Sequence, residues 1–294
     1  MGSVCVLDLD ETLVFAIANE EFFGANPAIL NPKSGTGKQA RQKELSYRAH
    51  ESWKLACSRT RAYAEAHLLL KSFQNSSHFV YVRPHAVELI RYCRENFRCL
   101  IIFTAANQAH ATSIHENLFV KLAGVRADYI FHRDHCGRFP QAPPNIRASL
   151  APADVASIGE FQKNLAYIRQ LVEQMETTCP SAEKDSSPTL DWTDCLFIDD
   201  SAMHAVTNGA YTLISPRYDY PSLRALLVTP GAGSRQPRLL REAAADVTLA
   251  RIRETIAEKM QMQHEANAHG TSYTWSMVDK KFSLFQQSVS GTRD

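Results

Sequence analysis

The clearest indication of the fold is a nine-residue stretch near the start of the chain, Val4-Cys5-Val6-Leu7-Asp8-Leu9-Asp10-Glu11-Thr12. Its first four residues are all apolar. A continuous apolar run of this length, rather than an alternating one, is typical of a strand that is buried on both faces, as in a parallel sheet. Two aspartates, two residues apart, follow the run directly. The stretch therefore predicts a buried strand that ends at a pair of carboxylates.

Two further apolar runs end in residues that can bind phosphate or metal. The three runs are 4–7 before Asp8, 99–103 before Thr104, and 195–198 before Asp199 and Asp200. Segments with helical spacing lie between them, at 86–95 and 109–122, as βαβ crossovers require. In an open α/β sheet, a ligand site forms at the carboxyl ends of the strands. We therefore predict an α/β fold with a central, mainly parallel sheet that brings these polar residues to one edge.

The Asp-x-Asp pair suggests phosphoryl transfer. Asp8 can attack phosphorus and form an aspartyl-phosphate, one of the covalent routes open to a carboxylate. Asp10 can protonate the leaving oxygen and later deprotonate the hydrolytic water. An aspartate after a strand is also a common turn residue, and Asp199 and Thr104 would each suit a helix cap. The occurrence of all three motifs at predicted strand ends favours the catalytic interpretation.

Such a site needs a cation, because both the nucleophile and a phosphate monoester are anionic. Mg²⁺ prefers oxygen ligands and usually keeps several waters or substrate oxygens. Asp8, the main-chain carbonyl of Asp10, and one or both of Asp199 and Asp200 would form a suitable set. Thr12 and Thr104 can donate hydrogen bonds to phosphoryl oxygens, and a lysine should complete the neutralisation of charge.

The composition is that of an ordinary globular protein. The 294 residues include 32 Lys and Arg against 31 Asp and Glu, so there is no strong nucleic-acid signal. Seven dispersed cysteines are typical of free thiols in a reducing compartment. No apolar stretch approaches the roughly 20 residues of a membrane span, and we expect no signal peptide. These features predict an intracellular protein of the cytoplasm or nucleus.

We expect one domain over residues 1–260, with two insertions and a tail. Residues 19–79 form a long insertion after the first strand, which begins as a loop and then has loosely helical spacing over about 39–73. Residues 175–192 are rich in Ser, Pro, Thr and charge, which predicts a mobile loop. The tail, 261–294, shows no clear period.

Several motifs together resemble a known family. They are, in chain order, 8–14, 83–85 with 88–90, 103–105, 132–136, 161–165, 197–201, 208–210 and 218–227. This set resembles the small CTD phosphatases, also called NLI-interacting-factor-like phosphatases, of the haloacid-dehalogenase (HAD) superfamily. The chain departs from the family pattern at Ala202, where proline is usual, and in the length of the segment after Asp10.

The resemblance implies a three-layer, Rossmann-like HAD fold, Mg²⁺, and hydrolysis of phosphoserine or phosphothreonine in a phosphoprotein substrate. It implies that Asp8 is the nucleophile and Asp10 the acid and base, and that Asp199 and Asp200 serve the metal together with them. The residues that it assigns to the phosphoryl group are Thr12, Thr104, Ala105 and Lys163.

Two other functions remain open. The insertion at 19–79 could cover the site and favour a small phospho-metabolite, or the chain could be a non-catalytic scaffold of the same fold.

Two further motifs fit less well. Residues 34–38 suggest a phosphate loop but have Pro32 and Gln39 where Gly and Ser or Thr are needed, and a zinc site at His132, His135 and Cys136 has no second ligand pair.

Overall fold

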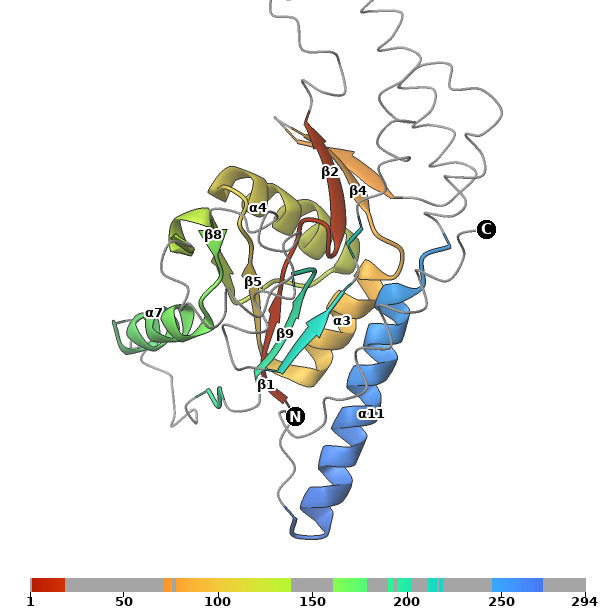
Figure 1. Ribbon diagram of the computed structural model, residues 1–294, viewed down its shortest axis with the longest axis vertical. Coiled ribbons are helices and arrows are strands. Elements are labelled where there is room, and N and C mark those ends of the chain that lie inside the picture. The colour runs from red at the N-terminus through yellow and green to blue at the C-terminus, as the bar shows by residue number, and fades with distance from the viewer. Residues whose placement is uncertain are drawn as a thin grey trace, which may run out of the picture. The chain divides into compact units, whose positions relative to one another are not determined.

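A computed structural model describes the chain in segments (Figure 1). The described residues are 2–18, 71–75, 78–138, 161–178, 190–192, 195–201, 211–215, 217–218 and 245–271. The chain divides into two compact units. The first comprises Met1–Leu13, His85–Arg217 and Thr248–Asp294, and the second comprises Val14–Pro84 and Tyr218–Val247.

The first unit is built on a five-stranded sheet in which every pair of neighbouring strands is parallel. Its strands are β1 (Gly2–Leu7), β5 (Phe97–Phe103), β6 (Tyr129–Phe131), β9 (Cys195–Asp199) and β10 (Tyr211–Ile214). Their order is β10-β9-β1-β5-β6. The chain builds outward from β1 to β6 and then returns to the other side of β1, so the strand order reverses there. A ligand crevice is expected outside the carboxyl ends of the strands at such a reversal.

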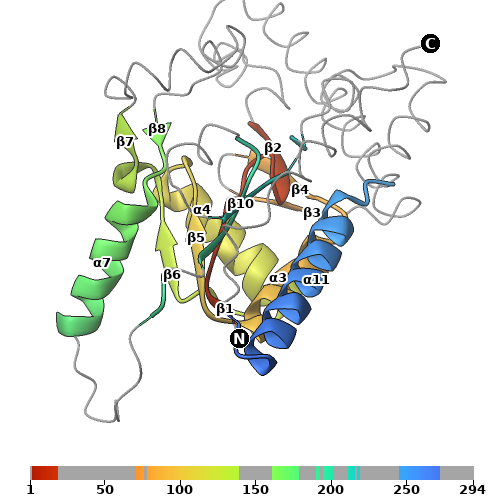
Figure 2. The same ribbon diagram turned by 60° about the horizontal axis from the view of Figure 1, so that its bottom comes forward.

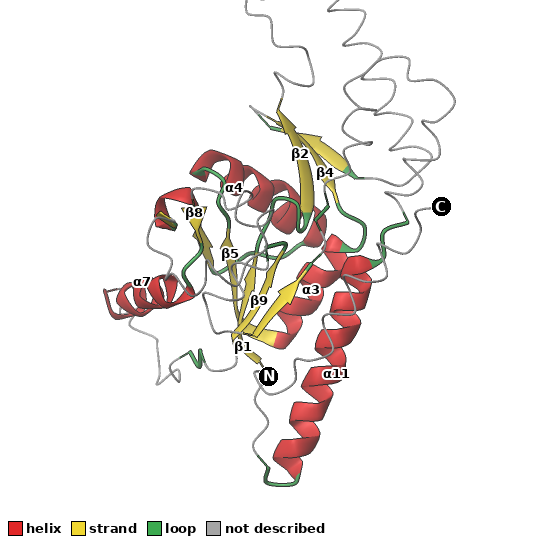
Figure 3. Cartoon of the chain, in the orientation of Figure 1, coloured by secondary structure: helices red, strands yellow, loops and turns green. Residues whose placement is uncertain are grey.

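Helices cover both faces of this sheet, as the sequence predicted (Figure 2). They are α3 (Ala86–Asn96), α4 (Gln108–Ile114), the π-helix η2 (His115–Ala123), α7 (Leu165–Thr178) and α11 (Thr248–Ala268). Helices α3 and α11 pack together on one side, and α7 lies on the other (Figures 2 and 3). The predicted three-layer α/β arrangement is thereby confirmed. Two short strands, β7 (Gly137–Arg138) and β8 (Phe161–Gln162), pair antiparallel outside the main sheet.

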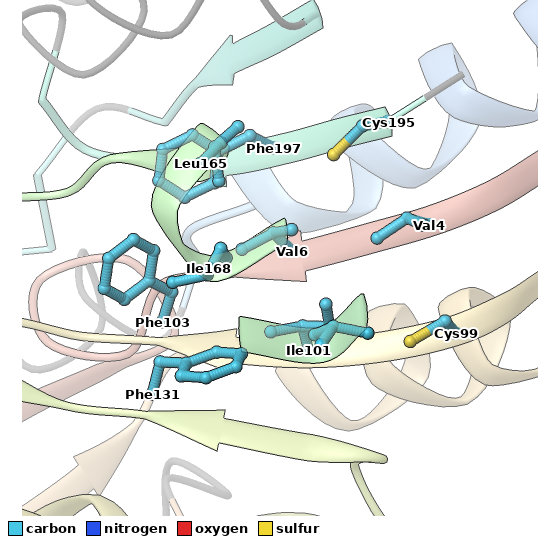
Figure 4. Close-up of a cluster of buried hydrophobic side chains, with 11 residues drawn as sticks. Val4, Val6, Cys99, Ile101, Phe103, Phe131, Leu165, Ile168, Cys195 and Phe197 are labelled. Carbon is cyan, nitrogen blue, oxygen red and sulfur yellow. The ribbon is translucent and has the colours of Figure 1, made fainter. Parts of the chain in front are cut away.

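The core between the sheet and α7 explains why the strands are apolar without interruption. Val4 and Val6 of β1 face Ile168 and Val172 of α7 in one buried cluster (Figure 4). Cys5 and Leu7, which point to the opposite face, are also fully buried. Because both faces are covered, positions 4–7 of β1 are withdrawn from water, and each buried aliphatic side chain contributes roughly 1.5–3 kcal/mol.

The second unit contains a three-stranded antiparallel sheet of order β2-β4-β3. Its strands are β2 (Val14–Ala18), β3 (Ser72–Gln74) and β4 (His78–Val82). Most of the insertion predicted at 19–79 lies outside the described residues. Its end is not helical, however, since Ser72 and Phe73 pair with Tyr81 and Val80 of β4. Pairing with the next strand along the chain overrides a loose helical spacing here.

Two predicted boundaries differ from the described elements. Helix α11 crosses residue 260, where the sequence analysis ended the domain, and it continues to Ala268. The expected loop at 175–192 begins inside α7, which runs to Thr178, and residues 179–189 lie outside the described part. Both helices bury apolar residues before these points, among them Ile252 and Ile256 of α11, whereas residues 175–177 and 261–268 include no buried side chain. The extra turns therefore continue helices that are already formed by their packed parts.

Candidate active site

The three predicted strand ends meet at one edge of the sheet. Leu7 of β1 pairs with Ile102 of β5 and with Ile198 of β9, so the residues that follow are level with one another. The backbone remains bonded past the strand ends: the Asp8 N–H donates to the Ile198 carbonyl at 2.9 Å, and the Thr104 N–H donates to the Phe131 carbonyl at 3.1 Å. The backbone positions of Asp8 and Thr104 are therefore fixed by the sheet itself.

Lys163 joins the two central carboxylates. It follows β8, and its Nζ donates to Asp199 Oδ2 at 2.7 Å and also contacts Asp8 Oδ1. All three side chains are buried, at 5% exposure or less. Buried charges persist only when they are paired, and one ammonium here serves two carboxylates. The structure thus brings the lysine that the resemblance nominated into contact with the predicted nucleophile.

A tight turn holds the first carboxylate. The Thr12 hydroxyl donates to Asp8 Oδ2 at 3.0 Å, and the Leu13 N–H donates to the Leu9 carbonyl at 2.8 Å. Between them, Glu11 adopts a left-handed backbone with φ of 61°. A non-glycine residue in this region carries strain of about 1 kcal/mol or more, which is typical of functional turns. Thr12, expected to bind phosphate, is hydrogen-bonded to Asp8 in this structure, and its phosphate contact stays a prediction.

The charges of the cluster shift the pKa values of its members. Burial raises the pKa of Asp8 well above its usual range, and the carboxylates of Asp199 and Asp200 add to the rise, whereas Lys163 opposes it. For Lys163, burial alone lowers the pKa, but Asp199 and Asp8 outweigh it, so the net pKa lies above the usual value. Lys163 is therefore cationic, but its charge does not offset the effect of burial and of the two neighbouring carboxylates on the pKa of Asp8.

The carboxylates of the cluster have the composition of a divalent-metal site. Asp8, Asp199 and Asp200 each offer a carboxylate oxygen, and these oxygens lie within 4.8 Å of one another. Hard oxygen donors of this kind suit a divalent cation. The Ser201 N–H donates to Asp199 Oδ1 at 2.8 Å and fixes that ligand in place. The sequence analysis also expected the main-chain carbonyl of Asp10 to bind the metal, and that contact stays a prediction.

Asp10 has a partner that the sequence analysis missed. His110 Nε2 lies 2.9 Å from Asp10 Oδ1, and the Thr104 hydroxyl lies 3.4 Å from Asp10 Oδ2. His110 is buried, whereas the Asp10 side chain is 33% exposed. A lone histidine in the first turn of α4 carries no distinctive signal in sequence, since the contact joins positions 100 residues apart.

Arg217 was also missed, and it lies at the rim of the site. Its Nε contacts Asp200 Oδ2 at 2.9 Å and Glu11 Oε2 at 3.4 Å. The arginine side chain is half exposed, so the pair is accessible to solvent and weaker than the buried contacts of Lys163.

The remaining predicted residues have structural contacts. The Ala105 carbonyl accepts a hydrogen bond from Arg133 Nε at 2.9 Å, and its phosphate-binding role stays a prediction. In the 3-10 turn η3 (Arg133–His135), the His132 N–H donates to His135 Nδ1 at 3.1 Å. Within the described segments, neither His132, His135 nor Cys136 belongs to a group of three metal-binding side chains.

The sequence matches a known protein family, and the fold is similar to that of solved structures. The model of the NLI interacting factor-like phosphatase family matches residues 3–222. A structure of Fcp1, described as an essential RNA polymerase II CTD phosphatase, is similar with a TM-score of 0.50 and 14% identity, over 94% of this chain and 69% of that one.

A variant of the fission yeast Fcp1 bound to beryllium fluoride matches with a TM-score of 0.49 and 13% identity over the same shares of the two chains. No curated protein matches the sequence. In the part of the chain that the structure covers, none of the helices combines the length and the apolar character needed to cross a membrane.

Proposed function

Because the chain belongs to the NLI interacting factor-like phosphatases, a family of HAD-type phosphatases, we propose that it hydrolyses phosphoserine or phosphothreonine in proteins with the help of Mg²⁺. The observation that carries this proposal is the buried Asp8, which contacts Lys163 and lies beside two further carboxylates. An aspartate in this setting is a nucleophile whose charge can be balanced while an anionic substrate approaches.

In the first step, an Asp8 carboxylate oxygen forms a bond to phosphorus as the bond from phosphorus to the serine or threonine oxygen breaks. Asp10 gives its proton to that departing oxygen. Lys163 offsets negative charge at Asp8 and the phosphoryl group. The Thr104 hydroxyl lies 3.4 Å from Asp10 Oδ2, and its expected bond to the phosphoryl group stays a prediction. The product of this step is an aspartyl-phosphate on Asp8 and a free alcohol.

In the second step, Asp10 is ionised and takes a proton from water. The oxygen of that water bonds to phosphorus, and the bond between phosphorus and Asp8 breaks. The Asp8 carboxylate is regenerated and inorganic phosphate leaves. Mg²⁺, held by Asp8, Asp199 and Asp200, would supply positive charge to the phosphoryl oxygens throughout.

The test is hydrolysis of p-nitrophenyl phosphate by wild type and Asp8→Asn, each with Mg²⁺ and with a chelator. We expect metal-dependent turnover that falls by at least about 1,000-fold in the variant, because the covalent route is lost. Asp134→Asn is the matched control, since the same change is made at a side chain that is 82% exposed. Activity of Asp8→Asn equal to wild type would refute the assignment of the nucleophile.

The substrate class needs a second comparison. Phosphopeptides, among them a phosphorylated RNA polymerase II CTD peptide, should be turned over faster than a panel of small sugar and nucleotide phosphates. Faster turnover of a metabolite would replace the protein substrate while leaving the chemistry intact. A folded wild type that binds no Mg²⁺ and hydrolyses neither class would favour the scaffold.

A further inference from the structure

His110 is a buried side chain that the two-step reaction above does not use. It lies in the first turn of α4, where the Asn107 side chain caps the helix by accepting a hydrogen bond from the His110 N–H at 2.9 Å. The cap fixes the backbone from which the imidazole projects, and the side chain is 5% exposed. Its Nε2 therefore reaches Asp10 from a rigid position.

We propose that His110 is a positioning residue that holds Asp10 in the orientation in which Asp10 exchanges the leaving-group proton. This inference rests on the proposed function. It follows from the unequal environments of the two Asp10 oxygens. Oδ1 lies 2.9 Å from His110 Nε2, whereas the contact of Oδ2 in the described residues is the Thr104 hydroxyl at 3.4 Å. The first is a full hydrogen bond and the second is at the limit of one.

The same imidazole tautomer serves both protonation states of Asp10. A hydrogen bond to the ionised carboxylate requires the proton on His110 Nε2. When Asp10 is the acid, Oδ1 can continue to accept that bond if the acidic proton is on Oδ2. His110 then keeps its own proton through both steps, and Oδ2 is the oxygen that gives and takes the transferred proton.

Thr104 supports this assignment. Its hydroxyl oxygen accepts a hydrogen bond from the Ala106 N–H at 3.0 Å, so its own hydrogen is free to turn toward Asp10 Oδ2. The weak contact leaves Oδ2 exchangeable while it restricts rotation of the carboxylate. His110 and Thr104 together hold Asp10 from both sides, and neither needs to touch the leaving group.

A positioning role of this kind predicts a dependence on the leaving group. The alkoxide of serine is strongly basic and needs a proton as it departs, whereas p-nitrophenolate departs without one. Loss of Asp10 orientation should therefore harm hydrolysis of a phosphoserine peptide far more than hydrolysis of p-nitrophenyl phosphate. A residue that only stabilises the fold would affect both substrates equally.

The experiment compares kcat/KM for these two substrates in wild type, His110→Leu, His110→Gln and His110→Asn. This ratio reports formation of the aspartyl-phosphate, which precedes the hydrolytic step that both substrates share. Leu removes the donor, Gln can place an amide N–H near the position of Nε2, and the amide of Asn is too short to reach Asp10. Asp10→Asn provides the reference for complete loss of the acid, and thermal unfolding confirms that each variant is folded.

We expect His110→Leu to reduce kcat/KM for the phosphopeptide by about 100-fold and for p-nitrophenyl phosphate by about threefold or less. His110→Gln should recover most of the phosphopeptide activity. An equal loss on both substrates, or a Gln variant as impaired as Leu, would overturn the inference while the phosphatase assignment stands. If the Leu variant does not fold, the contrast between Gln and Asn decides the same question. A folded wild type inactive on both substrates would overturn the proposed function and this inference with it.

Discussion

Replacement of Lys163 by methionine tests the charge balance of the site most directly. Methionine is similar in length but carries no charge, so Lys163→Met leaves Asp8 and Asp199 buried without the ammonium that contacts both. Removing one partner of a buried ion pair typically costs about 3–5 kcal/mol, because the remaining charge has lost its water and its partner. For a domain of this size that corresponds to a fall in Tm of roughly 6–20 °C.

The loss of stability in Lys163→Met should increase as the pH rises. Burial and the neighbouring carboxylates already raise the pKa of Asp8, and without Lys163 that pKa rises further. A carboxyl group whose pKa is raised by folding favours the folded state at low pH, and this contribution is lost as the pH rises through the raised pKa. The deficit of Lys163→Met should thus be larger at about pH 8 than at about pH 5.

A divalent cation should partly replace the missing charge. A ligand that binds only the folded state adds stability that grows with the logarithm of its affinity, and in the variant Lys163 no longer repels the cation. Mg²⁺ should therefore raise the Tm of Lys163→Met more than that of wild type, although turnover remains low because the lysine is absent from the phosphoryl site.

Thermal unfolding followed by circular dichroism, at both pH values with chelator and with Mg²⁺, measures all three effects. Lys121→Met is the matched control, because Lys121 is exposed and bonds only the neighbouring Asn117 side chain at 3.0 Å among its described contacts. It should change stability by no more than about 0.5 kcal/mol. If Lys163→Met with chelator at high pH is no less stable than Lys121→Met, the reasoning about the buried cluster is wrong.

Three further predictions concern stability away from the cluster. Burial lowers the pKa of His115, whose Nε2 accepts the Ala127 N–H at 3.2 Å. The free energy of unfolding should therefore fall as the pH drops below about 6.5, by at most about 1.4 kcal/mol per pH unit. In urea unfolding at a series of pH values, His115→Gln should flatten this slope. Ile168→Ala should cost about 2–5 kcal/mol by opening a cavity between α7 and the sheet, and an unchanged urea midpoint would contradict that packing. In the second unit, Arg83→Met should cost about 3–5 kcal/mol through loss of the buried contact to Asp246 at 2.8 Å, whereas a Tm equal to wild type would show that the pair is not needed.

The sequence predicted the strands of the site well and the helices on either side of them. The runs 4–7 of β1, 99–103 of β5 and 195–198 of β9 are buried on both faces, so their residues are apolar and the runs are visible without the structure. Strand β3 is different. It is three residues long and only half-buried, and its pairing with β4 supplies the stability that its own residues do not.

Among the candidate site residues, prediction from the residues themselves depended on a buried apolar run directly before them. Asp8 and Thr104 come directly after apolar runs, as Asp199 does, and the parallel register places the three within one residue of the same level. Lys163 has no such marker, and only the resemblance to a family nominated it. His110 and Arg217 were not predicted, because a solitary histidine or arginine looks the same in sequence whether it faces water or a carboxylate.

The sequence by itself thus determined the α/β sheet and the carboxylates at its edge, because burial on two faces and acidic residues after a strand are local patterns. Only the tertiary structure decided which nitrogen-bearing side chains meet those carboxylates. Lys163 reaches Asp8 across 155 positions of chain, and His110 reaches Asp10 across 100. Contacts of that separation depend on how the helices pack on the sheet, and packing is a property of the whole fold rather than of any segment of it.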